Sequence, residues 1–357
     1  MDEVERLTRR LVTVGVGDDC GEEETGDLVE SWLRRETDAE VERDAVGNVI
    51  ARKGEGSPSL GLVGHHDVVP PDESQVEDGS FVVDKRDGRL YGRGTADMKG
   101  SLAAAMLGFG DADPSSEVLL CSFVGEEKGG IGARHAVENG VSPDRAVVVE
   151  GSTGYSSSGV VDVGVAHRGR REWELTARGE SGHASQPDEA VNAVYEALAG
   201  VEEVRNYGFE TVEIAGEKVS GTAAVTRIES NVDGASNVIP ETCRFTVDER
   251  TVPTAEGLEP VSGLESDLVS EVPPMECDDD DFVSSVLEAV SDSDETDRDP
   301  DAVVKPHATD AGWLSRAGTD CVVCGAAERG EAHTSDESVS LDLLRRCRRI
   351  YRRLIST

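Results

Sequence analysis

Three short stretches of this chain set metal-binding side chains beside glycines. Residues 64–67 read Gly-His-His-Asp, residues 92–97 read Gly-Arg-Gly-Thr-Ala-Asp, and residues 124–127 read Val-Gly-Glu-Glu. Imidazole and carboxylate groups gathered at one place are what divalent zinc, manganese or cobalt requires. Because a carboxylate has two oxygens, Asp97 could bridge two cations. Of the adjacent acids Glu126 and Glu127, one could bind metal while the other takes a proton from water.

Each of these features also has a plain structural reading when taken singly. Most histidines satisfy local hydrogen bonds, glycine-rich segments form turns, and an exposed Glu-Glu pair is ordinary in an acidic protein. His65 and Asp67 lie two residues apart at a predicted strand end, so both could face one side, with Asp67 orienting the imidazole. His66, His135 and His307 are interpreted as structural residues.

The elements predicted around these residues would bring them to one edge of a sheet. Apolar runs that predict strands end just before acidic or histidine side chains: 59–64 before His65, 117–124 before Glu126, and 146–149 before Glu150. A small-residue helix is expected over 100–110. Alternating strands and helices predict an α/β fold, a mostly parallel sheet with helices on both faces. Such sheets carry their functional groups at the strand carboxyl ends.

The pattern changes after about residue 165 and predicts an inserted α+β domain. Strands are expected over 171–178, 222–230 and 242–250, and helices over 188–204 and 254–269. The chain then returns to the first domain, with a helix over 280–291, an acidic loop to residue 297, a strand over 320–324 and a last helix over 340–355. The expected organisation is therefore a discontinuous metal-binding catalytic domain, 1–166 and 274–357, and an insert, 167–273.

The charge of the chain restricts its partners. The 357 residues carry a formal net charge of −38, and six of them are lysines. An acidic shell poor in lysine suits a salt-rich cytosol, where screening removes self-repulsion. The alternative, an acidic binding face, would be patchy rather than spread along the chain. Either way, this charge argues against nucleic acid and anionic membranes as partners.

The seven cysteines do not suggest a disulfide framework, because their number is odd and their spacing scattered. Cys321 and Cys324 form one CxxC in an apolar run that predicts a buried strand, so no redox or zinc-binding role is assigned to them. The acidic first residues do not resemble a signal peptide, and no apolar run approaches the length of a membrane span. We therefore expect a cytoplasmic protein.

The order of these motifs, together with Gly-His at 182–183 and a histidine at 333, resembles the M20 family of metallopeptidases and deacylases. The resemblance runs from about residue 8 to 355. The family includes acetylornithine deacetylase, succinyl-diaminopimelate desuccinylase and carboxypeptidases of the glutamate type. It implies a homodimer made by the insert domain and two divalent metal ions, zinc in the first instance with cobalt or manganese as alternatives.

The resemblance also implies roles for individual residues. The expected metal ligands are His65, Asp97 as the bridge, Glu127, Glu150 and His333. Asp67 would orient His65, and Glu126 would be the general base that activates water and later protonates the leaving amine. His183 would reach into the partner's site and stabilise the oxyanion. Asn237 and Arg250 would hold the substrate's carboxylate.

The expected reaction is removal of an N-acyl group from a small amino-acid substrate, for example N-acetylornithine, N-succinyl-diaminopimelate or a carrier-linked lysine or ornithine. A di- or carboxypeptidase of the same family is the alternative, and a non-catalytic binding protein on the same fold is a third hypothesis. Three segments depart from the family pattern: Gly151 follows Glu150 where a proline is common, 307–312 resembles the family's Thr-Asp segment loosely, and 325–327 reads Gly-Ala-Ala instead of Gly-Pro-Gly. These departures fall in segments that recognise the substrate, so the sequence does not assign the acyl group or the amine of the substrate.

Overall fold

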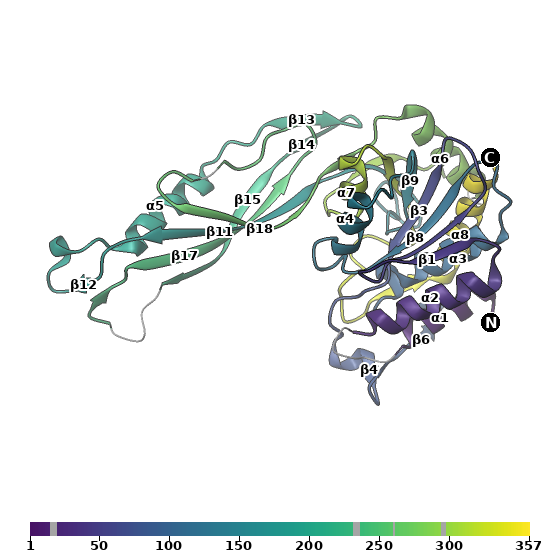
Figure 1. The fold of residues 1–357 in the computed structure, drawn as a ribbon, viewed down its shortest axis with the longest axis horizontal. Helices are drawn as coiled ribbons and strands as arrows, with labels where there is room; N and C mark the ends of the chain where they lie inside the picture. Colours follow the sequence, from purple (N-terminus) through teal and green to yellow (C-terminus); the bar gives the residue numbers. More distant parts are fainter. Residues whose placement is uncertain (15–19, 231–235, 260, 294–297) are drawn as a thin grey trace. The chain divides into compact units, whose positions relative to one another are not determined.

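The computed structural model describes residues 1–14, 20–230, 236–259, 261–293 and 298–357. Its contacts divide the chain into two compact units (Figure 1). Unit 1 comprises Met1–His167 and Met275–Thr357, and unit 2 comprises Arg168–Pro274. Each limit lies one residue from the domain limits expected from the sequence.

Unit 1 is built on one mixed sheet. The strands in spatial order are β1 (Glu40–Arg43), β2 (Val49–Lys53), β8 (Val118–Phe123), β3 (Leu60–His65), β9 (Arg145–Val148), β21 (Asp320–Val323), β10 (Val163–His167) and β19 (Met275–Glu276), with β20 (Ala302–Lys305) also paired to β10. The central strands β8, β3, β9 and β21 are parallel to one another. Antiparallel pairs lie toward the margins, β1 with β2, β2 with β8, and β10 with β21 and β19.

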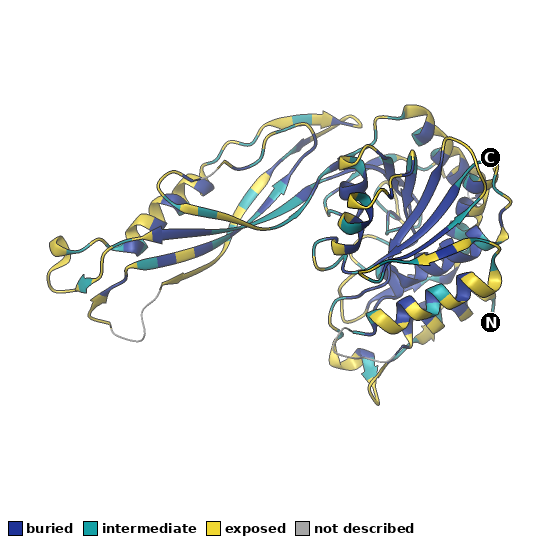
Figure 2. Cartoon of the chain, viewed as in Figure 1, coloured by how far each residue is buried: buried dark blue, intermediate teal, exposed yellow. Residues whose placement is uncertain are grey.

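The central strands are buried on both faces, as Figure 2 shows. Side chains alternate between the faces, so Leu60 and Leu62 of β3 join one core while Val63 turns to the other side. Near-continuous apolar strands of this kind are typical of a parallel sheet covered by helices on both sides. The predicted α/β class is therefore confirmed.

Helices cover both faces of this sheet. The core that contains Leu60 and Leu62 also contains residues of α1 (Glu3–Val12), α2 (Glu22–Glu36), α3 (Gly100–Asp111), α6 (Asp280–Ser293) and α8 (Leu341–Ser356). The helices α4 (Ile131–Glu138) and α7 (Ala311–Arg316) pack against each other, and α7 contacts β21 (Figure 1). The α1 helix begins where the Asp2 side chain accepts a hydrogen bond from the Glu5 amide at 2.8 Å.

Short elements complete unit 1. They are η1 (Glu73–Gln75), β4 (Val76–Glu77) paired with β5 (Ser80–Phe81), the three-stranded sheet of β22 (Ser338–Ser340), β7 (Arg89–Tyr91) and β6 (Asp84–Arg86), and the single turn η2 (Thr95–Lys99). The antiparallel pairing of β22 with β7 brings the segment after His333 alongside the segment that leads to Asp97. Two parts of the chain far apart in sequence thus meet at one place.

Unit 2 is a four-stranded antiparallel sheet with one long helix. The strand order is β15 (Thr222–Ser230), β17 (Thr242–Thr251), β11 (Gly169–Arg178) and β18 (Glu265–Val272). The helix α5 (Ala193–Arg205) packs on one face through Ala193, Ala197 and Val204. The remaining elements are β12 (Gly182–His183) paired with β16 (Val238–Ile239), η3 (Pro187–Glu189), and the hairpin of β13 (Thr211–Ile214) and β14 (Glu217–Ser220).

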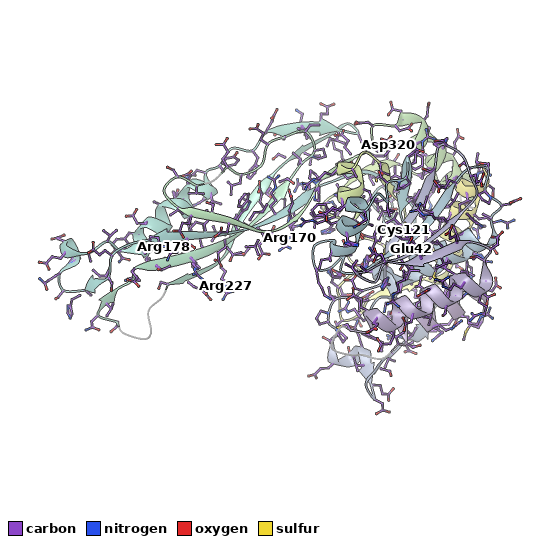
Figure 3. The ribbon with its side chains drawn as sticks, viewed as in Figure 1. Glu42, Cys121, Arg170, Arg178, Arg227 and Asp320 are labelled. Atoms are coloured by element: carbon purple, nitrogen blue, oxygen red, sulfur yellow. The ribbon has the colours of Figure 1, made fainter. Side chains whose placement is uncertain are left out.

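The face of this sheet opposite α5 is charged. Arg170 lies opposite Arg250 in the strand register, and both guanidinium groups donate to the Asp248 carboxylate, at 2.9 and 2.7 Å. Figure 3 shows Arg170, Arg178 and Arg227 on the strands of unit 2. Alternation of charged and apolar side chains along β11 and β17 explains why one face packs on α5 and the other is polar.

Two sequence predictions for the insert are wrong. The helix expected over 254–269 is absent from the residues described there, and residues 265–269 belong to β18. Leu258 and Val261 are buried at helix-like spacing, but Gly257 and Gly263 on either side of them disfavour a helix. The helix expected from 188 begins later because Asn192 caps it, its side chain accepting from the Val194 amide at 3.0 Å. Instead of two helices over the sheet, unit 2 has α5.

Other predicted elements agree with the structure to within a few residues at their ends. The acidic loop expected over 291–297 is partly wrong, because residues 291–293 extend α6, and residues 294–297 lie outside the described residues. The CxxC is buried as expected, with Cys321 on β21 and both thiols free. Among the described residues, no helix combines the length and apolar character that crossing a bilayer demands.

Candidate active site

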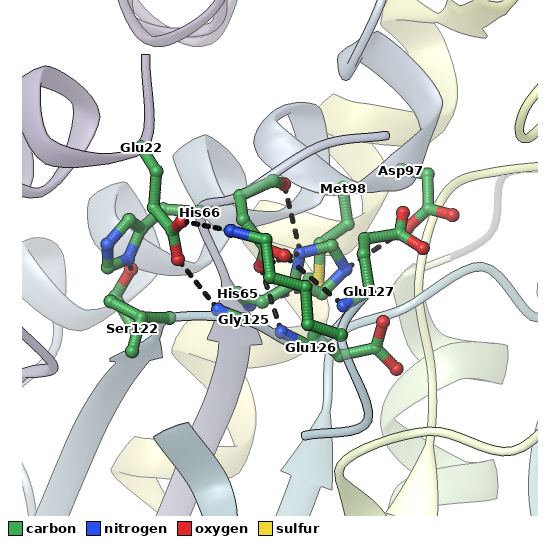
Figure 4. Close-up of polar contacts among 12 residues, drawn as sticks. Glu22, His65, His66, Asp97, Met98, Ser122, Gly125, Glu126 and Glu127 are labelled. Atoms are coloured by element: carbon green, nitrogen blue, oxygen red, sulfur yellow. Dashed lines mark hydrogen bonds and ion pairs between the residues drawn. The ribbon is translucent and has the colours of Figure 1, made fainter. Parts of the chain in front are cut away.

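His65 is the last residue of β3 and lies at the carboxyl edge of the parallel strands. Its side chain is 1% exposed, and its Nε2 lies 3.2 Å from Asp97 Oδ1. Its Nδ1 lies 3.3 Å from Asp67 Oδ1 and 3.2 Å from the Asp67 carbonyl oxygen. Gly64 leaves room for this geometry, because a Cβ there would meet Met98 Cε at 2.7 Å. The imidazole is thus held between Asp67 and Asp97; Figure 4 labels His65 and Asp97.

Asp97 is positioned through its backbone by a buried glutamate. Glu337 Oε1 accepts hydrogen bonds from the amides of Ala96 and Asp97, at 3.0 and 3.1 Å. The other oxygen of Glu337 accepts from Arg93, whose side chain is also buried. Glycines 92 and 94, both with positive φ, allow the chain to turn into this segment.

The loop after β8 carries the paired acids Glu126 and Glu127. Asp67 holds it in place, since its Oδ1 accepts from the Glu126 amide at 3.1 Å and its Oδ2 from the Glu127 amide at 3.2 Å. The loop closes with Gly129 and Gly130 at positive φ. There, Trp313 Nε1 donates to the Gly129 carbonyl at 3.2 Å. Asp67 therefore orients His65 and this loop together.

His333 joins the same group from a segment near the end of the chain. Its Nε2 lies 3.0 Å from Asp97 Oδ2 and 2.8 Å from Glu127 Oε1. Asp97 consequently faces a different histidine with each oxygen, His65 with Oδ1 and His333 with Oδ2. Unlike the buried His65, the side chain of His333 is 49% exposed.

Glu150 follows β9 and lines the same cavity as His333. Its Oε2 is 3.9 Å from Lys305 Nζ, and its Oε1 is buried without a hydrogen-bond partner among the described residues. A cavity of about 260 Å³ opens over these groups. Its lining includes Asp97, Glu126, Glu127, Glu150 and His333, and also Tyr155, Lys305, His307 and Arg329. We call His65, Asp97, Glu126, Glu127, Glu150 and His333 the site cluster.

The pKa values of the site cluster reflect acids crowded in a buried space. Burial, and then the neighbouring Glu150 carboxylate, raise the pKa of Glu126 well above its usual range. Burial raises the pKa of Glu150 to about 7. Hydrogen bonds with Asp97 and Glu127 raise the pKa of His333 to about 10. Negative charge adds to burial in raising the pKa of Glu126, and it is the main cause for His333, so positive charge bound among these groups would oppose that part of the shift at Glu126.

The donor set of the site cluster fits two divalent cations. Ligand atoms of His65, Asp97 and Glu127 lie within 4.8 Å of one another, and so do those of His65, Glu126 and Glu150. Imidazole nitrogen and carboxylate oxygen in these numbers suit zinc and its neighbours. The partnerless Oε1 of Glu150 and the two histidines on opposite oxygens of Asp97 are the features that a bound pair of cations would explain.

The remaining predicted site residues, His183, Asn237 and Arg250, lie in unit 2. The pairing of β12 with β16 sets His183 opposite Val238, so that Asn237 Nδ2 lies 3.5 Å from His183 Nε2. Both side chains are exposed. Arg250 is half-buried and is engaged by Asp248 through two hydrogen bonds, at 2.7 and 3.2 Å. The structure thus brings His183 and Asn237 together, while Arg250 is paired within its own sheet.

Sequence reasoning missed several residues of this site. Glu337 and Arg93 hold the backbone of Asp97, and Asp310, whose carboxylate oxygens have no partner among the described residues, lies buried beside Gly130. Lys305, Tyr155 and Arg329 line the cavity. One signal was available for Lys305, a rare lysine directly after the apolar residues Ala302–Val304. His66 is buried with Ser122, in keeping with its structural interpretation.

Comparison with known proteins gives matches along most of the chain. The profile described as Peptidase family M20/M25/M40 matches residues 61–357. An acetylornithine deacetylase of Myxococcus xanthus is 28% identical over 342 residues, which cover 89% of this chain and 85% of that protein. A succinyl-diaminopimelate desuccinylase of Alkalilimnicola ehrlichii is 36% identical over 210 residues, covering 55% of this chain and 54% of that protein.

Solved structures share the fold at low identity. An M20 family metallo-carboxypeptidase from Sulfolobus solfataricus superposes with a TM-score of 0.75 at 17% identity, covering 99% of both chains. A Bacillus subtilis protein described as a dinuclear metal-binding peptidase of the M20 family superposes with a TM-score of 0.67 at 16% identity, covering 99% of this chain and 96% of the other. At these identities the likeness shows the fold.

Proposed function

This chain belongs to Peptidase family M20/M25/M40, whose profile matches residues 61–357, and we propose that within this family of amide hydrolases it removes an N-acyl group from a small amino acid. The observation that carries the proposal is Asp97 placed between His65 and His333, with Glu127 beside it and the Glu126 loop held by Asp67. Relatives named acetylornithine deacetylase and succinyl-diaminopimelate desuccinylase support the substrate class.

In this proposal two divalent cations, zinc or else cobalt or manganese, are held by His65, Asp97, Glu127, Glu150 and His333. When bound, they would polarise the scissile carbonyl and lower the pKa of a water molecule. Asp67 keeps His65 in one orientation through Nδ1, so that Nε2 is directed at the cations. Glu337 and Arg93 keep Asp97 in place from behind.

Glu126 is the residue that moves protons. Its carboxylate takes a proton from the attacking water and later delivers it to the nitrogen of the leaving amine. Because Asp67 binds the backbone of both Glu126 and Glu127, the base and a ligand keep a fixed spacing.

We further propose that unit 2 makes a homodimer and that His183 serves the active site of the partner subunit as an oxyanion donor. Two features of unit 2 support an interface. Tyr195 and Leu198, three residues apart on α5, are 70% and 51% exposed, and β15 is an edge strand of its sheet. Asn237, close to His183, would bind the substrate's carboxylate. Arg250 would also bind this carboxylate, giving up its hydrogen bonds to Asp248.

A peptidase activity is the second candidate, because the profile that matches residues 61–357 is described as a peptidase family. The same site cluster would cleave a peptide bond by the same proton transfers. The two candidates differ in what surrounds the acyl group, so substrate panels separate them. We also propose that the protein works in a salt-rich cytoplasm, because its net charge of −38 needs screening.

The test of the proposed function is amine release from a defined panel. The purified protein, loaded with zinc, cobalt or manganese in molar salt, is incubated with N-acetylornithine, N-succinyl-diaminopimelate and several dipeptides. We expect one N-acyl amino acid to be the best substrate, and Glu126→Gln to lower kcat by about 100- to 10,000-fold while metal content is unchanged. Preference for dipeptides would favour the second candidate, and full turnover by Glu126→Gln would remove Glu126 from its role.

A further inference from the structure

We propose that Lys305 and Arg329 form an anion-binding wall in the active-site cavity, which selects an acyl group ending in a carboxylate, of the succinyl type, over acetyl. This inference rests on the proposed function, because it assigns the acyl side of the same site. Both side chains line the cavity of about 260 Å³ over the site cluster, together with Tyr155.

The side chain of Lys305 is buried and held in place by packing. Lys305 is the last residue of β20 and is 3% exposed. Its alkyl chain lies across Gly164 of β10, where a Cβ would meet Lys305 Cδ at 3.1 Å and Cγ at 3.3 Å. A larger residue at 164 would therefore crowd the lysine. A buried ammonium group is costly unless something negative meets it.

The carboxylate nearest to this ammonium group does not neutralise it in the loaded site. Glu150 Oε2 lies 3.9 Å from Lys305 Nζ, which is an ion-pair distance without a hydrogen bond. In the proposed function Glu150 gives its charge to a metal ion. Lys305 would then face the cavity with its charge available to a ligand.

Arg329 supplies a second cation from the segment that leads to His333. Its guanidinium carbon lies 5.9 Å from the centre of the Tyr155 ring. Its amide donates to the Thr153 carbonyl at 3.2 Å, which ties the segment to the strand end that carries Glu150. Tyr155 itself is fixed by its amide, which donates to Asp162 at 2.9 Å. Arg329 is exposed and can adjust to a ligand.

The charges in the cavity favour an anionic ligand. Two divalent cations would compensate the four carboxylates of Asp97, Glu126, Glu127 and Glu150. The other lining acid, Glu328, is paired with Arg89 at 3.0 Å. The positive charges of Lys305 and Arg329 are then left to interact with a ligand. An acetyl group offers them no charge, whereas a succinyl group ends in a carboxylate that ammonium and guanidinium groups can bind.

The first experiment measures selectivity with the metal-loaded full chain. For N-succinyl and N-acetyl derivatives of the same amino acid, we expect Lys305→Met and Arg329→Gln each to lower the ratio of kcat/KM, succinyl over acetyl, by about 10- to 100-fold. Lys218→Met, which removes an exposed lysine of unit 2, is the matched control and should leave the ratio unchanged. If both substrates lose activity equally in both variants, the wall is not a specificity element and the inference is overturned.

The second experiment separates binding from turnover. Calorimetric titration of metal-loaded Glu126→Gln protein with succinate and with acetate should show tighter binding of succinate, and adding Lys305→Met or Arg329→Gln should remove the difference. If no amide is cleaved but succinate still binds more tightly than acetate and the variants remove this difference, the proposed function is wrong and the anion-binding wall is supported. If succinate and acetate bind equally, the wall is refuted even where amides are cleaved. Arg329→Gln keeps the test open should Lys305→Met fail to fold, because Arg329 is exposed.

Discussion

Replacing Glu337 by alanine should damage both the stability of unit 1 and its affinity for metal. The Glu337 side chain is fully buried, accepts from two backbone amides, and pairs with Arg93, whose side chain is 5% exposed. Removing one partner of a buried ion pair costs about 3–5 kcal/mol, because the other charge stays buried and unpaired. For a unit of this size, that corresponds to a fall in the melting temperature of about 6–20 °C.

The effect on metal follows from the contact with Asp97. Loss of a group that orients a ligand lowers metal affinity by about 10- to 100-fold. Thermal denaturation followed by circular dichroism, and competition with a zinc-binding dye, measure the two quantities. Glu138→Ala is the control: its pair with Arg134 spans 2.9 Å, but both side chains are more than half exposed, so the loss should be about 0.5 kcal/mol or less. Equal behaviour of the two variants would refute the reasoning.

Three further predictions concern metal, thiols and assembly. Dialysis against a chelator should abolish amide hydrolysis, and zinc, cobalt or manganese should restore it, while recovery by magnesium alone would argue against the nitrogen-containing donor set. Burial raises the pKa of Cys121 and of Cys347 to about 12, so at pH 8 about one such thiol in 10,000 is ionised. Iodoacetamide should therefore label these two cysteines in denaturant but not in the native protein. Rapid labelling of either in the native protein would contradict their burial. Mixing and reannealing inactive Glu126→Gln and His183→Ala subunits should restore about a quarter of wild-type activity, because half of the dimers then hold one complete site; no recovery despite mixed dimers would show that His183 acts within its own subunit or not at all.

The parallel core was predictable because each motif sits at the end of an apolar run. Strand propensity and the rule that parallel strands present functional groups at their carboxyl ends together located His65, Glu126 and Glu150. The roles of Asp97 and His333 needed the family resemblance, because a turn residue and a loop histidine have no periodicity to place them. Their contacts at 3.0 and 3.2 Å depend on long-range packing.

The errors have physical causes. Leu258 and Val261 have the spacing of a buried helix face, yet they pack into the core of unit 2 from an irregular segment whose neighbours include glycine and proline. Glu337 escaped notice because a buried carboxylate in a chain with 73 acids has no distinguishing local signal. Its partners, Arg93 and the amide of Asp97, lie more than 200 residues away. Such pairings are decided by the tertiary fold.

The most direct test of the central claim is anomalous X-ray diffraction from crystals of the zinc-loaded protein, recorded on both sides of the zinc absorption edge. The account predicts two zinc peaks, with Asp97 lying between them, His65 and Glu150 on one and Glu127 and His333 on the other, and the Glu126 carboxylate beside both. One peak remote from Asp97, or two peaks bound by other side chains, would contradict it.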